Sequence, residues 1–105
     1  MKNVALTEAV YYMLLSLIKP MHGYGIMQNV EELSGGRVRL AAGTLYGAIT
    51  TLLEKGWIES VDAEDASRKK EYMITEEGLD ALKDELARLE ELVENGRKVM
   101  KEEMV

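Results

Sequence analysis

Hydrophobic and polar residues form distinct blocks along the chain, and the first block predicts a buried helix. From Ala9 to Ile18 the sequence is almost wholly apolar, which is typical of a helix that is covered on more than one side. Thr7 is suited to cap the start of this helix, and Pro20 disfavours helix at the residue before it. The protein is small, so one side of this helix can pack on the rest of its own chain and another subunit is a candidate to cover the other side.

The second block predicts a helix from about Gly23 to Leu33, with its apolar residues on one stripe. Gly35 and Gly36 follow, and glycine supplies the left-handed conformation that commonly ends a helix. The alternation of polar and apolar residues over Arg37 to Leu40 then predicts a short strand at most.

A third helix is predicted from Gly43 to Gly56, and it has two contrasting faces. Large apolar residues recur at helical spacing on one face: Leu45, Ile49, Leu52 and Leu53. The residues mostly on the other face are small or hydroxylated: Gly43, Thr44, Gly47, Thr50 and Thr51. A helix with one anchored face and one small polar face can lie close against a partner. The DNA major groove is wide enough to admit such a helix.

Two strands and one long helix complete the predicted elements. Segments 57–61 and 68–74 are expected to pair as a hairpin around the polar loop 62–67, and Thr75 suits the start of the last helix. Apolar positions then step by three and four residues, as in a heptad seam of about three heptads: Leu79, Leu82, Leu86, Leu89, Val93, Gly96 and Met100. A helix of ~25 residues would be roughly 40 Å long, which is more than so small a body covers.

This order of elements predicts a mostly α protein with a small β-hairpin: a winged helix-turn-helix followed by a long C-terminal helix. We expect residues 1–75 to form the winged helix-turn-helix domain for DNA binding and residues 76–105 to form a C-terminal dimerisation helix. The length of 105 residues suits a single small core, which oligomerisation would help to stabilise.

Composition narrows the class of protein and its compartment. The chain has no cysteine, which excludes disulfides, and no apolar run approaches the ~20 residues that span a bilayer. We therefore expect a cytoplasmic protein with no membrane partner. The formal net charge is −6, but residues 75–105 hold ten acids and five bases. Residues 1–74 hold nine acids and eight bases, so this part is close to neutral and can carry a local basic face.

Four segments of the sequence resemble the PadR family of bacterial transcriptional regulators. They are His22-Gly23-Tyr24-Gly25-Ile26, Gly43-Thr44-Leu45-Tyr46, Leu53-Glu54-Lys55-Gly56-Trp57-Ile58 and Lys70-Glu71-Tyr72-Met73-Ile74-Thr75-Glu76-Glu77-Gly78. The resemblance implies a homodimeric winged-helix repressor of the short branch, in which one C-terminal helix grips the partner subunit. It also implies a small hydrophobic effector near the dimer interface. The two-fold symmetry of a dimer predicts a palindromic operator in double-stranded DNA.

Candidate DNA contacts come from the third helix, the segment before it and the hairpin: Arg37, Arg39, Thr44, Tyr46, Gly47, Thr50, Arg68, Lys69 and Lys70. Thr44 lies near a helix start, where N–H groups favour a phosphate, and Tyr46 can donate its hydroxyl to one. The alternatives are that Thr44 only caps the helix and that Tyr46 only packs against the wing. Arg37 and Arg39 either reach phosphates or form a solvated pair.

The hairpin carries the sharpest basic cluster, residues 68–70, on its returning strand. Acids accompany this cluster, so the charges of residues 62–70 sum to zero. Either the basic side of the wing faces DNA or the wing contributes little to binding.

The first and last helices supply the predicted dimer interface: Tyr11, Leu14, Leu15, Leu79, Leu82, Leu86, Leu89, Val93 and Met100. Catalysis has little support, because no serine, histidine and acid form a recognisable constellation. His22 is the only histidine and no cysteine accompanies it, so we expect a structural role for His22 and no metal or cofactor. The alternative function is a protein-interaction module whose acidic heptad helix recognises a different protein.

Overall fold

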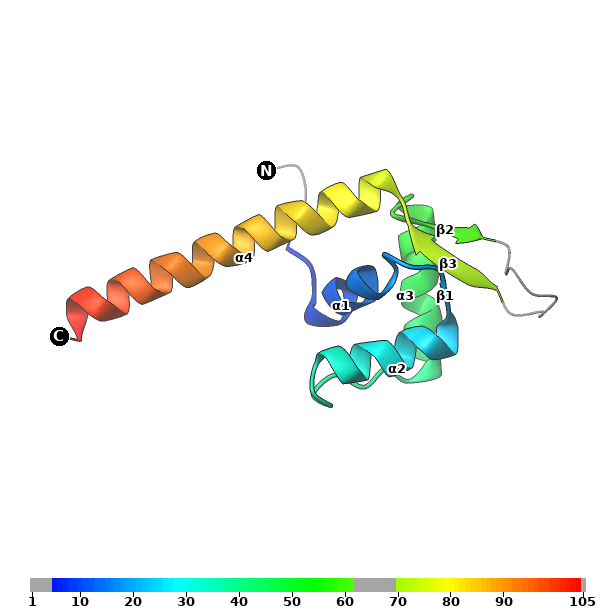
Figure 1. Cartoon of the computed structure of the whole chain (residues 1–105), viewed down its shortest axis with the longest axis horizontal. Coiled ribbons are helices and arrows are strands. Elements are labelled where there is room, and N and C mark those ends of the chain that lie inside the picture. The colour runs from blue at the N-terminus through cyan, green and yellow to red at the C-terminus, as the bar shows by residue number, and fades with distance from the viewer. Residues whose placement is uncertain (1–4, 62–69, 105) are drawn as a thin grey trace.

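The computed structural model describes residues 5–61 and 70–104, and these ranges contain four helices and three strands. The helices are α1 (Glu8–Ser16), α2 (Gly23–Leu33), α3 (Ala42–Glu54) and α4 (Glu76–Glu103), and the strands are β1 (Met21–His22), β2 (Ile58–Val61) and β3 (Glu71–Ile74). Figure 1 shows α1, α2 and α3 in one body with the sheet at its edge, while α4 runs past α1 and away from the body. This is a winged helix-turn-helix with a long C-terminal helix, so the predicted fold class is confirmed.

Two threonine caps determine where the first and last helices begin. The Thr7 hydroxyl oxygen accepts a hydrogen bond from the Val10 N–H at 3.2 Å, and the Thr75 hydroxyl oxygen accepts one from the Gly78 N–H at 3.1 Å. Such caps satisfy N–H groups that have no partner within the first turn of a helix. Both predicted helix starts are confirmed.

Helix α3 ends at Gly56, whose left-handed backbone conformation allows two hydrogen bonds that cap the helix. Gly56 has φ +75°, its N–H donates to the Leu53 carbonyl, and the Trp57 N–H donates back to the Leu52 carbonyl at 3.0 Å. This pattern is a Schellman motif, which satisfies carbonyl groups left free in the last turn. The chain then turns directly into β2, so the end of α3 lies where the sequence predicts it.

The sheet is antiparallel with strand order β1-β3-β2, and one of its strands differs from the sequence prediction. The segment Arg37–Leu40 forms no strand. The Ser34 hydroxyl oxygen accepts a hydrogen bond from the Val38 N–H at 2.9 Å, which holds this segment as a loop. The third strand is instead the two-residue β1, whose Met21 and His22 pair with Tyr72 and Glu71 of β3.

The core lies where α1, α2, α3 and the sheet meet. Its buried residues are Met13, Leu14, Leu17, Ile26, Val30, Leu45, Ile49, Leu52, Ile58, Tyr72 and Leu82. Two members, Leu14 and Leu82, were predicted to lie in the dimer interface. That assignment is wrong for these side chains, because both are buried against the core of their own chain. Helical periodicity marks the apolar face of a helix and does not say which apolar surface covers it.

Helix α4 is buried at its start and exposed over the rest of its length. Gly78, Ala81, Leu82 and Glu85 are buried, whereas residues 90–104 are all exposed. We call residues 86–103 the arm. The arm makes the chain elongated, with principal extents of 61 × 30 × 22 Å. In the described part of the chain, no helix is both long enough and apolar enough to cross a membrane.

A buried ion pair marks the point where α4 leaves the body. The Glu85 carboxylate is 4% exposed, and it accepts hydrogen bonds from the Arg88 guanidinium at 2.7 and 2.8 Å and from the Leu6 N–H at 3.2 Å. The Arg88 hydrogen bonds lower the pKa of the Glu85 carboxyl, burial acts in the opposite direction, and the Leu6 hydrogen bond adds to the lowering. Glu85 therefore joins the N-terminal segment to the base of the arm.

Candidate nucleic-acid interface

Helix α3 has one buried face and one open face. Leu45, Ile49 and Leu52 are buried in the core, whereas Thr44, Gly47 and Thr50 are exposed. A Cβ atom added at Gly47 would have no neighbouring atom within 4 Å. The open face of α3 is therefore free of other described parts of the chain and is built from small side chains, as the sequence predicts.

The start of α3 has no side-chain cap. The N-cap residue is Ala41, which makes no side-chain hydrogen bond to the first turn. Thr44 lies inside the helix, so the alternative that Thr44 is the cap is wrong. The first N–H groups of a helix lack partners within it and form the positive end of its dipole, which favours an anion such as phosphate.

The two threonines near the end of α3 bond to the helix itself. The Thr50 hydroxyl donates to the Tyr46 carbonyl at 3.0 Å, and the Thr51 hydroxyl donates to the Gly47 carbonyl at 3.2 Å. Each hydroxyl oxygen keeps its lone pairs as acceptors, and each side chain also carries a methyl group. Thr50 can thus accept a hydrogen bond or make an apolar contact at a base edge.

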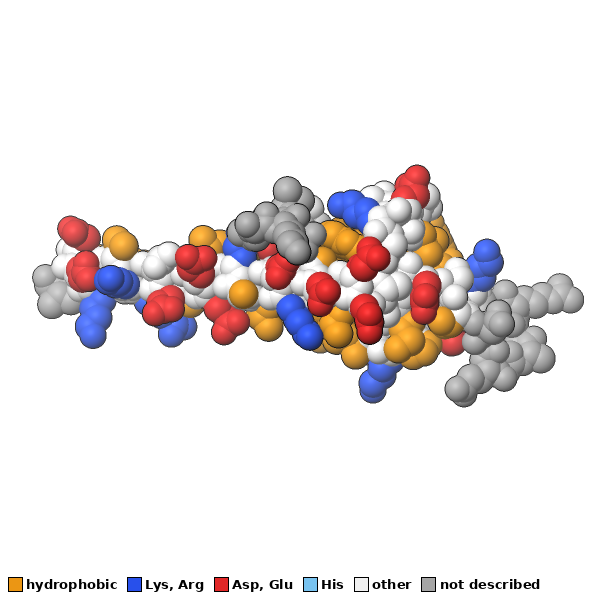
Figure 2. All heavy atoms as spheres, turned by 90° about the horizontal axis from the view of Figure 1, so that it is seen from above, with side chains coloured by type: hydrophobic (Ala, Val, Ile, Leu, Met, Phe, Trp, Pro, Cys, Tyr) orange, Lys and Arg blue, Asp and Glu red, His pale blue; other side chains and the backbone are white. Residues whose placement is uncertain are grey.

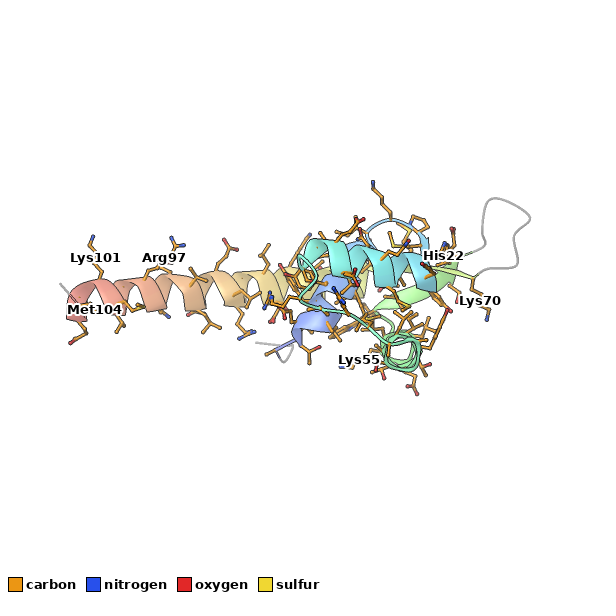
Figure 3. The ribbon with its side chains drawn as sticks, turned by 90° about the horizontal axis from the view of Figure 1, so that it is seen from below. His22, Lys55, Lys70, Arg97, Lys101 and Met104 are labelled. Carbon is orange, nitrogen blue, oxygen red and sulfur yellow. The ribbon has the colours of Figure 1, made fainter. Side chains whose placement is uncertain are left out.

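Tyr46 connects α3 to the start of α2 and to the sheet. Its hydroxyl lies over Gly23, and it shares a hollow of about 330 Å³ with residues of α2 and β3. We call this hollow the tyrosine hollow; it is lined by His22, Gly23, Tyr24, Tyr46, Lys70 and Tyr72. Tyr46 is 52% exposed, so it contacts its own chain and also presents a surface to a partner. Figure 3 shows His22 and Lys70 at the same end of the molecule.

His22 has the structural role that the sequence predicts. It is the N-cap of α2, and its Nδ1 atom accepts a hydrogen bond from the Gly25 N–H at 3.2 Å. An accepting Nδ1 carries no proton, so the ring nitrogen that can donate is Nε2.

Two predicted phosphate contacts are occupied by carboxylates of the same chain. Arg37 forms an ion pair with Glu8, and the Arg39 Nε atom lies 3.5 Å from a Glu31 carboxylate oxygen. All four side chains are largely exposed, and such surface pairs are worth little. The structure thus favours the solvated alternative for both arginines in the free protein, although a phosphate can compete for either side chain.

The structure describes one residue of the basic cluster at the wing, Lys70. Lys70 is exposed and lines the tyrosine hollow, whereas Arg68 and Lys69 lie outside the described residues. Acidic side chains are spread along α4, as the view onto that helix shows (Figure 2). The acidity of the chain therefore follows α4, mostly its first part before the arm, rather than α3, whose one acidic residue is Glu54.

Sequence reasoning missed one residue of this surface. Tyr24 is 55% exposed and lines the tyrosine hollow beside Tyr46. No local pattern in the sequence marks Tyr24, because its place beside Tyr46 depends on the approach of α2 and α3.

A winged helix-turn-helix whose third helix has an open face is the architecture of DNA-binding regulators. The sequence profile of the transcriptional regulator PadR-like family matches residues 13–84. The protein belongs to this family, and the resemblance found in the sequence is confirmed.

Solved structures from several organisms share this fold. A transcriptional regulator from Clostridium thermocellum is 28% identical, with 93% of this chain and 95% of that chain covered and a TM-score of 0.66. A PadR family transcriptional regulator from Eggerthella lenta is 27% identical, with 87% and 80% covered and a TM-score of 0.69. RosR from H. salinarum is 28% identical, with 90% and 96% covered and a TM-score of 0.63. No curated protein matches the sequence.

Proposed function

We propose that this protein is a homodimeric transcriptional repressor that binds a palindromic operator in double-stranded DNA. The observation that carries the proposal is the open, small-residue face of α3 on a helix anchored by Leu45, Ile49 and Leu52. In winged-helix proteins of this kind, the recognition helix enters the major groove. A regulator of transcription works where the chromosome is, so a cytoplasmic location belongs to the same proposal.

The proposed contacts divide into groove and backbone contacts. Gly47 and Thr50 face the base edges, because small side chains let the helix approach closely and Thr50 can accept a hydrogen bond. Thr44 lies in the uncapped first turn of α3, which faces a phosphate. Tyr46 and Lys70 contact the flanking backbone, and Arg68 and Lys69 extend this contact along the wing. Arg37 and Arg39 exchange their carboxylate partners for phosphates.

The arm supports the homodimer. Residues 86–103 have no covering element in the described chain, yet they carry a row of exposed apolar side chains, including Leu86 at 48%, Val93 at 53% and Met100 at 59% exposed. Leu86, Leu89 and Val93 line a shallow groove of about 550 Å³ on the arm. Most helical stability in proteins comes from packing of an apolar face, so this stripe needs a partner.

The proposed interface keeps the predicted residues that retain open surface: Tyr11, Leu15, Leu79, Leu86, Leu89, Val93 and Met100. The first helix and the arm of one subunit pack on those of the other. Two copies related by a two-fold axis then present two α3 helices to half-sites one helical turn apart, about 34–36 Å. A small hydrophobic effector between the subunits would change this separation and so weaken operator binding.

Fluorescence anisotropy with labelled DNA from upstream of the protein's own gene tests this function. We expect tight binding that resists scrambled competitor and weakens as salt increases, since phosphate contacts release counterions. Binding no better than to scrambled DNA would contradict the assignment for that DNA. It would favour the alternative function, a protein-interaction module that uses the acidic heptad helix, and a chain that stays monomeric at micromolar concentration would favour it further.

A further inference from the structure

The tyrosine hollow combines several hydrogen-bond donors with positive charge. Tyrosines 24, 46 and 72 line it together with His22 and Lys70. The first turn of α2 forms part of the wall of the hollow. This helix has 11 residues, and its N-terminus is the positive end of its dipole. In a protein with 19 acidic residues, none of the described residues lining this hollow is acidic.

Tyr72 brings an available hydrogen-bond donor to the hollow from the core side. It is only 8% exposed and packs into the core, yet its hydroxyl forms no hydrogen bond with another described residue. In the described part of the chain, every fully buried side-chain polar atom has a hydrogen-bond partner. The Tyr72 hydroxyl oxygen has none among the described residues, so it must retain contact with solvent. The buried ring therefore brings a free donor to the lining of the hollow. A phosphate oxygen that enters the hollow can therefore accept a hydrogen bond from this hydroxyl.

The register of β3 brings the lysine and the tyrosine to the same side. Tyr72 lies in β3 and Lys70 directly precedes this strand; the two residues are two positions apart and both line the hollow, whereas Glu71 between them does not. The hollow thus joins three elements: the start of α2, the first half of α3 through Tyr46, and the wing strand β3. A ligand bound here would fix α3 relative to the wing.

We propose that the tyrosine hollow binds one phosphate group of the DNA backbone, held by the hydroxyls of Tyr24, Tyr46 and Tyr72 and by the Lys70 ammonium group. This inference rests on the proposed function and adds a phosphate site that uses mainly neutral donors. Neutral tyrosine donors bind a phosphate without replacing a counterion, whereas each lysine or arginine contact releases one. Tyrosine and lysine variants therefore have different salt dependences.

The test compares single variants of the full chain on one duplex selected for binding and on a scrambled duplex, at four salt concentrations. We expect Tyr24→Phe and Tyr72→Phe each to weaken binding on the order of 10- to 100-fold, as for one lost hydrogen bond to a charged group, with an unchanged salt slope. Lys70→Gln should also weaken binding and reduce the slope by about 0.9. The losses should be equal on both duplexes, because phosphate contacts carry no sequence information.

Tyr12→Phe is the matched control, because Tyr12 lies on α1 and outside the hollow. It should bind both duplexes as the wild type does, and circular dichroism should show that all variants are folded. If the wild type binds the selected duplex and both tyrosine variants bind it with the same affinity, the phosphate site is overturned and the proposed function stays intact. If the wild type does not prefer the selected duplex, the proposed function itself fails.

Calorimetric titration with inorganic phosphate separates a backbone phosphate from a free anion. We expect no saturable binding of phosphate below millimolar concentration, because the free ion lacks the contacts along the rest of the DNA. Tight phosphate binding that is lost in Tyr72→Phe, with unchanged DNA affinity in that variant, would show that the hollow takes a free anion and would overturn the assignment to DNA.

Discussion

The hydroxyl of Tyr46 on α3 lies over Gly23, the first residue of α2, so that a Cβ atom at position 23 would come within 2.6 Å of the hydroxyl oxygen. Only a residue without a side chain lets the ring occupy this position. Glycine is therefore required at position 23 for the placement of Tyr46 in the tyrosine hollow, and the requirement comes from a contact rather than from backbone conformation.

Gly23→Ala should weaken DNA binding without unfolding the protein. The added methyl group displaces the Tyr46 hydroxyl, and the half-exposed ring can rotate away at little cost. Alanine is a better helix former than glycine, so the free energy of unfolding should stay level or rise by up to about 1 kcal/mol. Anisotropy and thermal unfolding measure the two effects. Unchanged DNA affinity would show that the position of Tyr46 does not matter for binding.

Two glycines of α4 should respond to alanine in opposite directions. A Cβ atom at Gly78 would lie 2.1 Å from the Trp57 carbonyl oxygen, and backbone cannot move away as a side chain can. Gly78→Ala should therefore destabilise the protein by about 1–3 kcal/mol or more. A Cβ atom at Gly96 would meet nothing within 4 Å, so Gly96→Ala should stabilise the arm by about 0.5–1 kcal/mol. Urea unfolding of both variants checks this contrast, and equal effects would contradict it.

Thr50→Ala should reduce discrimination between operator sequences more than it reduces binding to scrambled DNA. Loss of one base contact typically costs about 1–3 kcal/mol at the base pair concerned. Thr51→Ala is the control for loss of a helix-bonded hydroxyl, because Thr51 makes the same kind of hydrogen bond, to the Gly47 carbonyl, and lines a different hollow with Val10 and Trp57. Competition with single-base variants of the operator measures the effect. The same specificity profile in Thr50→Ala and the wild type would exclude a base contact at Thr50.

Glu85→Gln should lower stability at neutral pH and have less effect in acid. The folded-state pKa of Glu85 is lowered by Arg88, so its ionised form stabilises the fold above the ordinary value of about 4.3. This contribution is lost as the pH falls through the folded-state pKa. Urea unfolding at pH 7, 5 and 3 should give a difference from wild type that is largest at pH 7. Glu91→Gln, at an exposed position of α4, is the control, and a difference that grows towards pH 3 would contradict the account.

The double variant Leu86→Glu with Val93→Glu should convert the dimer into monomers. Both side chains are about half exposed in the single chain, and a dimer would bury the added charges in an apolar seam. Sedimentation velocity at micromolar concentration measures the oligomeric state. Lys98→Glu introduces the same residue on the opposite side of the arm and should leave the dimer intact. A double variant that still sediments as the wild type would place the interface elsewhere.

Local chemistry explains why the sequence predicted the helices so closely. The caps Thr7 and Thr75 and the Schellman turn at Gly56 act over three to five residues, so a local pattern contains them completely. The strand β1 could not be predicted in this way. It has two residues, and it exists because Met21 and His22 meet a strand that lies about 50 positions later in the chain.

The site was predicted in part, for a related reason. The open face of α3 follows from its apolar period, and Thr44, Gly47 and Thr50 are exposed as expected. The tyrosine hollow depends on the approach of α2, α3 and β3, so Tyr24 and Tyr72 carried no local signal of their role. The partners of Arg37 and Arg39 come from α1 and α2, which sequence spacing alone does not bring together.

Selection from a library of random duplexes by the purified full chain tests the central claim most directly, because it requires no knowledge of the operator. We predict enrichment of a two-fold symmetric sequence whose half-sites are about one helical turn apart, and the purified wild type should bind it far more tightly than a scrambled duplex. After several rounds, a pool with no enriched sequence would contradict the account of this protein as a sequence-specific DNA-binding regulator.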